Sequence, residues 1–184
     1  PVVAGELIVS AITIQSSTSS SGADVTLTPQ DNQVKVSSHV VSFTMGASDV
    51  TKLKALASHA SSEQTTWFSV TSSLIKDIAE NSNQVITTSA AKKAAAYTAD
   101  SIAPTLSTFV TANPNKGTII LEFSEPVLDT SFESTKLTLY STATAQGGRN
   151  EYTLLHGATV SYVDEAVKTQ LSFKLDSRDK QGIE

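Results

Sequence analysis

Short runs in which every second residue is apolar dominate this 184-residue chain and limit its possible folds most strongly. Ile12-Thr13-Ile14-Gln15 is one such run. Alternation of this kind has the period of a strand with one buried face. The expected strands are residues 12–15, 24–28, 33–36, 41–45, 66–71, 84–87, 106–110, 117–123, 136–140, 151–154, 158–162 and 170–175. Turn-forming segments such as residues 20–24, 113–117 and 146–150 separate them. Many short strands spaced about 8 to 12 residues apart predict an all-β sandwich or barrel.

Residues 48–57 break the alternation and predict one short helix. Ser48 is suited to be the N-cap residue, Asp49 adds an acidic group to the first turn, and Leu53 and Leu56 fall on one face. The Ala-rich stretch at residues 90–96 is ambiguous, because it is too short for a stable helix of its own.

The chain also resembles itself. Residues 1–3 align with residues 126–128 and residues 12–17 with residues 137–142 at an offset of 125, while residues 41–45 align with residues 171–175 and Asp49 with Asp179 at an offset of 130. A fixed period interrupted by a loop insertion is typical of tandem repeats. The alternative is that alternating strands match by chance.

This alignment predicts where the chain divides. A Pro-containing link at residues 100–106 predicts two domains, residues 1–100 and 101–184. Only the second copy has strands 106–110 and 117–123, and only the first has strands 66–71 and 84–87. We therefore expect residues 1–100 to be the closing part of one repeat and residues 101–184 the opening part of the next. Either the polypeptide continues on both sides or a neighbouring subunit lends the missing strands, as in donor-strand exchange.

Composition narrows the class of protein. Charged residues make up only 17% of the chain, below the roughly 25% of average domains, whereas Ser and Thr exceed a quarter. The net charge of −5 argues against nucleic-acid binding. No apolar run is long enough to cross a bilayer, and no secretion signal opens the chain. Because Cys is absent, disulfides and thiolate chemistry are excluded. A hydroxyl-rich β-protein of this kind suits an extracellular location.

No catalytic constellation or cofactor-binding motif stands out. His39, His59 and His156 lie in separate segments without the spacing of metal ligands.

Two kinds of non-catalytic site are possible. Asp77, Asn81 and Asp100 are candidate Ca²⁺ ligands near the ends of a sandwich, and capping of turns is the alternative role for them. Hydroxyl-rich loops are candidate O-glycosylation sites, or simply polar loops. The candidate acceptors are Thr18, Ser19, Ser20, Ser21, Thr87, Thr88 and Ser89.

Several of these segments together resemble known repeats. Residues 97–106, followed by Leu121-Glu122-Phe123-Ser124-Glu125-Pro126-Val127, are similar to the signature of bacterial-type immunoglobulin-like repeats of secreted proteins. Residues 48–54, 65–70 and 75–81 are similar, in this order, to the Sig-like mastigoneme repeats of heterokont protists, which build tubular flagellar hairs. Glu80-Asn81 stands where that family usually has Gly-Asn, so we expect the turn there to differ.

The resemblance implies an all-β fold of immunoglobulin-like β-sandwich repeats, with one short helix near residues 48–57. It implies a non-enzymatic structural subunit of an extracellular filament or appendage, closed by self-association or by neighbouring repeats. A cell-surface adhesin or carbohydrate-binding stalk module is the alternative function, and glycans would then be partners.

Overall fold

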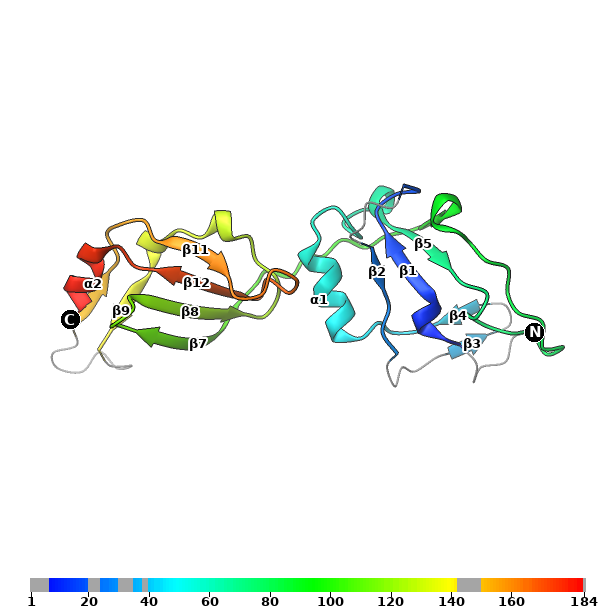
Figure 1. Ribbon diagram of the computed structural model, residues 1–184, viewed down its shortest axis with the longest axis horizontal. Helices are drawn as coiled ribbons and strands as arrows, with labels where there is room; N and C mark the ends of the chain where they lie inside the picture. The colour runs from blue at the N-terminus through cyan, green and yellow to red at the C-terminus, as the bar shows by residue number, and fades with distance from the viewer. Residues whose placement is uncertain (1–6, 20–23, 30–34, 38–39, 142–149, 184) are drawn as a thin grey trace. The chain divides into compact units, whose positions relative to one another are not determined.

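The computed structural model describes residues 7–19, 24–29, 35–37, 40–141 and 150–183, and these form two compact units. Unit 1 comprises residues 1–102 and unit 2 residues 103–184. The boundary lies two residues from the one expected from the Pro-containing link. The described residues are mostly β-sheet, with four antiparallel sheets and two α-helices (Figure 1).

Unit 1 contains two antiparallel sheets and helix α1. The first sheet has the strand order β2-β1-β5-β6, and the second pairs β3 with β4. The elements are the 3-10 helix η1 (Val9–Ala11), β1 (Ile12–Gln15), β2 (Val25–Thr26), β3 (Lys35–Ser37), β4 (Val40–Ser42), α1 (Ala47–Ala55), the 3-10 helix η2 (Glu63–Thr65), β5 (Trp67–Val70), the 3-10 helix η3 (Thr88–Ala90) and β6 (Lys92–Lys93). Their core is built on Val9, Ile12, Leu27 and Val70, with Phe43 packed against it.

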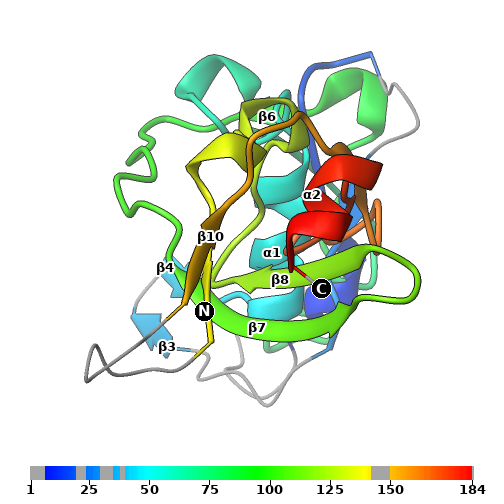
Figure 2. The same cartoon turned by 90° about the vertical axis from the view of Figure 1, so that its left-hand side faces the viewer.

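Unit 2 also contains two antiparallel sheets and one helix. One sheet has the order β11-β12-β8-β7, and the other pairs β10 with β9. The elements are β7 (Leu106–Asn113), β8 (Thr118–Phe123), the 3-10 helices η4 (Asp129–Ser131) and η5 (Ser134–Lys136), β9 (Thr138–Tyr140), β10 (Glu151–Thr153), β11 (Thr159–Tyr162), β12 (Gln170–Lys174) and α2 (Ser177–Ile183). Figure 2 shows β7 beside β8.

Both sheets of unit 2 contribute to one core. Ile119 and Leu121 of β8 and Phe173 of β12 are buried together, and Leu139 of β9 and Tyr152 of β10 pack against them. The rings of Phe132 and Phe173 lie 5.0 Å apart. The sheets therefore face each other across a common apolar layer.

Helix α1 corrects one detail of the expected helix. Gly46, which has extended backbone, is the N-cap residue, so the prediction that Ser48 caps the helix is wrong and Ser48 lies in the first turn. Asp49 in the first turn and Lys52 and Lys54 in the last complement the helix dipole. Leu53 is buried, which fixes the face that the helix turns to the core.

Three further segments differ from the expected strands and helix or were left open by the sequence. Helix α2 was not expected, because Gly182 and the absence of an apolar stripe hide it in the sequence. The Ala-rich stretch, which was ambiguous, begins at the last residue of η3 and contains the two-residue strand β6. Residues 84–87 contribute only an isolated bridge between Val70 and Ile86. Residues 33 and 34 of one expected strand lie outside the described residues.

The turn at Glu80-Asn81 keeps the conformation that glycine favours. Glu80 has a φ of 65°, in the left-handed region that side chains rarely adopt. Asp77 stabilises this turn, because its carboxylate accepts hydrogen bonds from the backbone N–H groups of Ala79 and Asn81. Glu80 therefore holds a left-handed backbone conformation although it carries a side chain.

Residues aligned by the internal repeat make the same bonds in both units. Thr13 pairs with Thr26 through their hydroxyls at 2.9 Å, and Thr138 pairs with Thr153 in the same way at 2.8 Å. The N–H of Leu27 donates to the Ile12 carbonyl at 3.0 Å, as the N–H of Leu154 does to the Leu137 carbonyl. The two units thus share the order 3-10 helix, strand, strand, hairpin and α-helix.

The two units differ in where their additional strands lie, which is after the shared order in unit 1 and before it in unit 2. Unit 1 adds β5 and β6 after its helix, and β5 pairs with β1. Unit 2 has β7 and β8 before its 3-10 helices, and β8 pairs with β12.

Among the described residues, neither helix combines the length and apolar character needed to cross a bilayer.

Candidate functional site

A buried aspartate occupies the third position of the helix in each unit. The side chains of Asp49 in α1 and Asp179 in α2 are each 1% exposed. The alignment of these residues in the sequence pointed to this shared position. Buried carboxylates are uncommon unless hydrogen-bonded, so their partners define what each one does.

Asp49 ties α1 to Thr28, which lies two residues after β2. The N–H of Thr28 donates to Oδ2 at 2.8 Å, and the Thr28 hydroxyl donates to the same carboxylate at 3.0 Å. Lys52, on the next turn, approaches Oδ1 at 3.9 Å. The carboxylate therefore joins α1 to the chain just after β2.

Asp179 makes the equivalent connection in unit 2 with more partners. The N–H groups of Leu155 and His156 donate to its two oxygens at 3.0 and 2.9 Å. The Tyr152 hydroxyl donates to Oδ1 at 2.9 Å, and Nδ1 of His156 lies 3.1 Å from the same oxygen. Thr28 and Leu155 hold equivalent positions, since each follows the buried leucine after the second strand of the shared order.

The partners of Asp179 control its ionisation. Burial raises the pKa of the carboxyl, but the N–H of Leu155, the imidazole of His156, the hydroxyl of Tyr152 and the N–H of His156 outweigh it and lower the pKa to about 2. The same hydrogen bond to Asp179 raises the pKa of Tyr152. Asp179 is therefore held as an anion, and its task is to fasten the helix.

The two candidate calcium ligands in the Glu80 turn lie together, whereas the third has other partners. Nδ2 of Asn81 donates to Asp77 Oδ2 at 3.0 Å, so the amide and the carboxylate bind each other. These bonds hold the pKa of Asp77 below its usual value. Asp100 pairs with Lys54 at 2.8 Å and accepts the N–H of Ile102. Within the described ranges, no group of three or more His, Asp or Glu side chains could hold a metal ion.

The candidate glycosylation acceptors that the structure describes are exposed. Thr18 and Ser19 follow β1, and Thr87, Thr88 and Ser89 lie around η3. Ser20 and Ser21 lie outside the described residues.

The histidines lie apart from one another in contacts of different kinds. His59 is buried, with its Nε2 atom 3.6 Å from Asp24 Oδ1, and His156 contacts Asp179. His39 lies outside the described residues.

The outer edge of β9 distinguishes this strand from its counterpart β1 in unit 1. Among the described residues, β9 pairs only with β10, although the equivalent β1 pairs with β2 on one side and β5 on the other. The carbonyl of Leu137 and the N–H of Ser141 bond toward the β10 side. Because directions alternate along an antiparallel strand, the backbone groups of Thr138 and Tyr140 face the outer edge.

An apolar cleft of about 490 Å³ in unit 2 contains residues of the β9 segment. Leu121 and Leu171 line it from β8 and β12, and Phe132 and Leu137 line it from the segment that leads into β9. Leu128, which is 61% exposed, also borders it. The cleft is thus lined by apolar side chains of the four-stranded sheet and of the segment that precedes β9.

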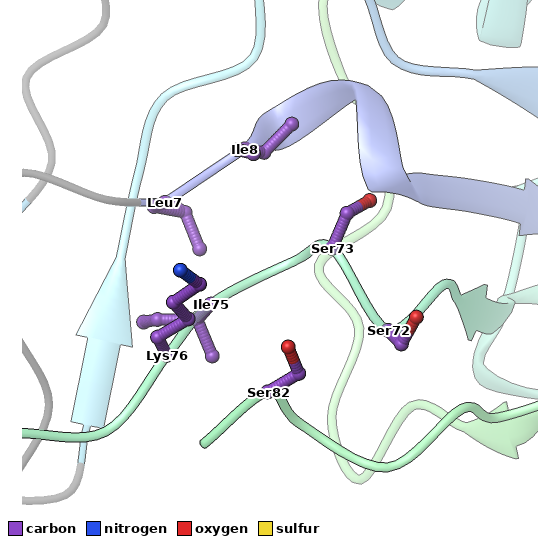
Figure 3. Close-up of a pocket in the computed structure, with 7 residues that line it drawn as sticks. All are labelled: Leu7, Ile8, Ser72, Ser73, Ile75, Lys76 and Ser82. Carbon is purple, nitrogen blue, oxygen red and sulfur yellow. The ribbon is translucent and has the colours of Figure 1, made fainter. Parts of the chain in front are cut away.

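The matching segment of unit 1 lies beside a smaller set of apolar groups. Leu7 and Ile8 line a hollow of about 500 Å³ with Ile75 and Lys76, and three serines complete it (Figure 3). Leu7 and Ile8 stand 125 residues before Phe132 and Glu133, which line the cleft of unit 2. In unit 1, therefore, the chain that follows β5 lies against these residues.

Comparison with known proteins gives no relative. No protein-family model, curated protein or solved structure matches the chain. The interpretation of the site therefore rests on its geometry and on the internal repeat.

Proposed function

We propose that this chain is part of a tandem array of immunoglobulin-like β-sandwich repeats that serves as a structural subunit of an extracellular filament or appendage. The observation that carries the proposal is the repeated fastening of a helix to a strand by a buried aspartate, Asp49 in one unit and Asp179 in the other. Two units with the same element order and the same internal bonds are what a tandem array contains.

The chemistry of the repeated groups favours a mechanical role. The carboxylate of each aspartate accepts hydrogen bonds from backbone N–H groups of its own unit, and these bonds stiffen the unit. The exposed hydroxyls at Thr87, Thr88 and Ser89 suit O-linked glycans on an extracellular surface. The resemblance to Sig-like mastigoneme repeats supports a flagellar-hair type of filament.

Electron microscopy of the native material tests this function. We expect filaments with a regular axial repeat. Dispersed single particles at every concentration would contradict the proposal. Intact-mass measurement of the same material detects O-glycans as increments of hexose mass.

A cell-surface adhesin or carbohydrate-binding stalk is the second candidate. Its support is the exposure of two aromatic side chains in unit 2, Phe109 at 52% and Tyr140 at 50%, because sugar rings stack on exposed aromatic faces. Binding on a glycan array that Tyr140→Ala and Phe109→Ala both abolish would favour the adhesin. Unchanged binding in both variants would remove this support.

A further inference from the structure

We propose that the edge of β4 that faces away from β3 binds an extended strand of the β8 type, antiparallel to β4 and supplied by a further repeat. The chemistry of the partner is that of β8, a strand whose core face carries apolar side chains at alternate positions. This inference rests on the proposed repeat array and names the partner of one of its units.

Strands β4 and β12 hold the same place in the two units, but only β12 has a neighbour on both sides. They align at an offset of 130 residues, and each pairs antiparallel with the strand before it, which is β3 or β11. The other edge of β12 pairs with β8, whereas β4 pairs with β3 alone among the described strands. Unit 2 therefore contains the strand that the equivalent edge of unit 1 would take.

The backbone groups of Val41 and Phe43 face this edge of β4. In unit 2 the carbonyl of Gln170 accepts a hydrogen bond from the residue that follows β11, so Gln170 faces β11. Because directions alternate along an antiparallel strand, Leu171 and Phe173 face β8. Val41 and Phe43 are the counterparts of these two residues, so their N–H and carbonyl groups are the ones that a new strand would bond.

The next position shows the missing bond directly. In unit 2 the N–H of Leu175 donates to the carbonyl of Gly117, just before β8, at 2.8 Å. Met45 is the counterpart of Leu175, and its N–H has no hydrogen-bond partner among the described residues. A strand placed as β8 is placed in unit 2 would supply this acceptor.

The side chains on the core face of this segment are less covered in unit 1 than in unit 2. Leu171, Phe173 and Leu175 are 1%, 0% and 8% exposed. Of their counterparts, residues 41 and 43 are only partly buried and Met45 is 37% exposed. In unit 2, β8 adds two buried side chains to the same core cluster, and unit 1 has no counterpart of them among its described residues. Burial of apolar surface therefore favours the entry of such a strand.

The register of the bound strand follows from β8 and β12. Ile119 lies opposite Phe173, and Leu121 lies opposite Leu171. The incoming strand therefore places its Ile119 equivalent opposite Phe43 and its Leu121 equivalent two positions further along. Residues directly opposite in an antiparallel pair point to the same face, so both side chains would enter the core of unit 1.

A second copy of this chain is a poorer source of the strand than a further repeat. In each copy β8 is already bonded to β12 on one side and to β7 on the other. Its transfer to another copy would open the edge of β12 for every edge of β4 that it closes. A β8-type strand whose edge is unpaired gains backbone hydrogen bonds when it binds.

The experiment uses the full chain and a fluorescently labelled synthetic peptide of residues 116–125. We expect saturable binding in fluorescence anisotropy, with the labelled peptide alone as the baseline. Amide exchange measured by NMR should slow at Val41 and Phe43 when the peptide is bound. The peptide should also raise the urea midpoint of unit 1, followed by Trp67 fluorescence, because a ligand that binds only the folded state stabilises it.

Two variant peptides with the same composition provide the matched control. Ile119→Asp places a carboxylate on the face that enters the core, so this peptide should bind at least about tenfold more weakly. Ile120→Asp places the same charge on the opposite face, because successive side chains of a strand alternate. This second peptide should bind about as tightly as the peptide without a substitution.

Three results would overturn the inference. The first is unchanged exchange at Val41 and Phe43 at saturating peptide. The second is equal weakening by both variant peptides, since the register would then play no part. The third is protection of these amides without peptide that rises with protein concentration together with a dimer, which would assign the edge to a second copy. Peptide binding without filaments would contradict only the proposed function, and filaments without peptide binding only the strand site.

Discussion

Strands β1 and β9 are equivalent in sequence and position, yet they differ in what lies beside them. β1 is central in its sheet, between β2 and β5, and its residues Ile12 and Gln15 are buried. β9 pairs with β10 alone among the described strands, and Tyr140, the counterpart of Gln15, is half exposed. The bonds to the next strand along the chain are the same for β1 and β9. These bonds are therefore present in both units, whether or not a strand like β5 is described on the other side.

The two cores differ in the same sense. Phe173 in unit 2 is completely buried between the two sheets, because β8 and β12 pair beneath it. Its counterpart Phe43 in unit 1 is only partly buried. The aligned phenylalanine is therefore more deeply buried in the unit where β8 pairs with the strand that carries it.

The largest expected effect separates these cores. Phe173→Ala should lower the free energy of unfolding of unit 2 by about 4 kcal/mol, whereas Phe43→Ala should cost unit 1 about 2 kcal/mol, because less apolar surface is lost. Urea unfolding followed by Trp67 fluorescence reports unit 1, since this is the single Trp of the chain and lies in β5. Hydrogen exchange of β8 and β12 reports unit 2. Equal losses in the two variants would contradict the difference in burial.

The second effect tests the repeated aspartates. Asp179→Ala leaves four hydrogen-bonding groups without this acceptor and should cost about 3 kcal/mol. Asp49→Ala removes the acceptor of the Thr28 N–H and hydroxyl and the longer contact with Lys52, and should cost about 2 kcal/mol. The same two readouts assign each loss to its unit. The matched control is Glu133→Ala in unit 2, which removes an exposed pair with Lys136 and should change stability by less than about 0.5 kcal/mol. If Asp49→Ala or Asp179→Ala lowered the free energy of unfolding by no more than the control does, that aspartate would not hold its helix in place.

The third effect concerns the strand edges directly. Thr13 and Gln15 face β5, whereas Thr138 and Tyr140 face the outer edge of β9. We expect the amide of Thr138 to exchange about 100-fold faster than that of Thr13, because Thr13 lies in a strand with a neighbour on each side, whereas β9 pairs only with β10 among the described strands. Exchange measured by NMR on the full chain compares both amides in one sample. Similar rates at the two positions would mean that the edge of β9 is already covered.

Sequence predicted the strands well because their alternating period is local. The expected strands at residues 12–15, 151–154 and 158–162 have bounds within two residues of β1, β10 and β11. Helix α2 was missed since its short sequence carries Gly182 and no apolar stripe, and its burial comes from Asp179 alone among its residues. Alignment of Asp49 with Asp179 was the one signal that could have found it.

The partners of the aspartates could not be predicted in the same way. His156 and Tyr152 reach Asp179 across 23 and 27 residues of chain, and the hydrophobic pattern does not encode such contacts. Nothing in the spacing of Asp77, Asn81 and Asp100 showed that the first two form one turn while the third pairs with Lys54. Short-range periodicity defines strands, whereas polar contacts depend on the packing that brings strands together.

The smallest effect is the pH dependence of unit 2. The hydrogen bonds of Asp179 hold its pKa at about 2 in the folded protein, below the ordinary value of 3.8 that it regains on unfolding. A group with a lowered folded pKa stabilises the fold above its unfolded pKa, and this stabilisation is lost as the pH falls through the folded pKa. We therefore expect the Asp179 contribution to be complete above about pH 4 and to disappear toward pH 2.

Other carboxylates titrate in the same range, so the measurement must be a difference. Urea unfolding of the wild type and of Asp179→Asn, each from pH 5 to pH 2 and followed by hydrogen exchange of β12, isolates the contribution of this side chain. The gap in stability between the two proteins should narrow as the pH falls, and at pH 5 it should be smaller than the loss in Asp179→Ala, because Asn still accepts one hydrogen bond. A gap that stays constant over this range would mean that the charge of Asp179 does not fasten α2, and the equivalence with Asp49 would then be one of position alone.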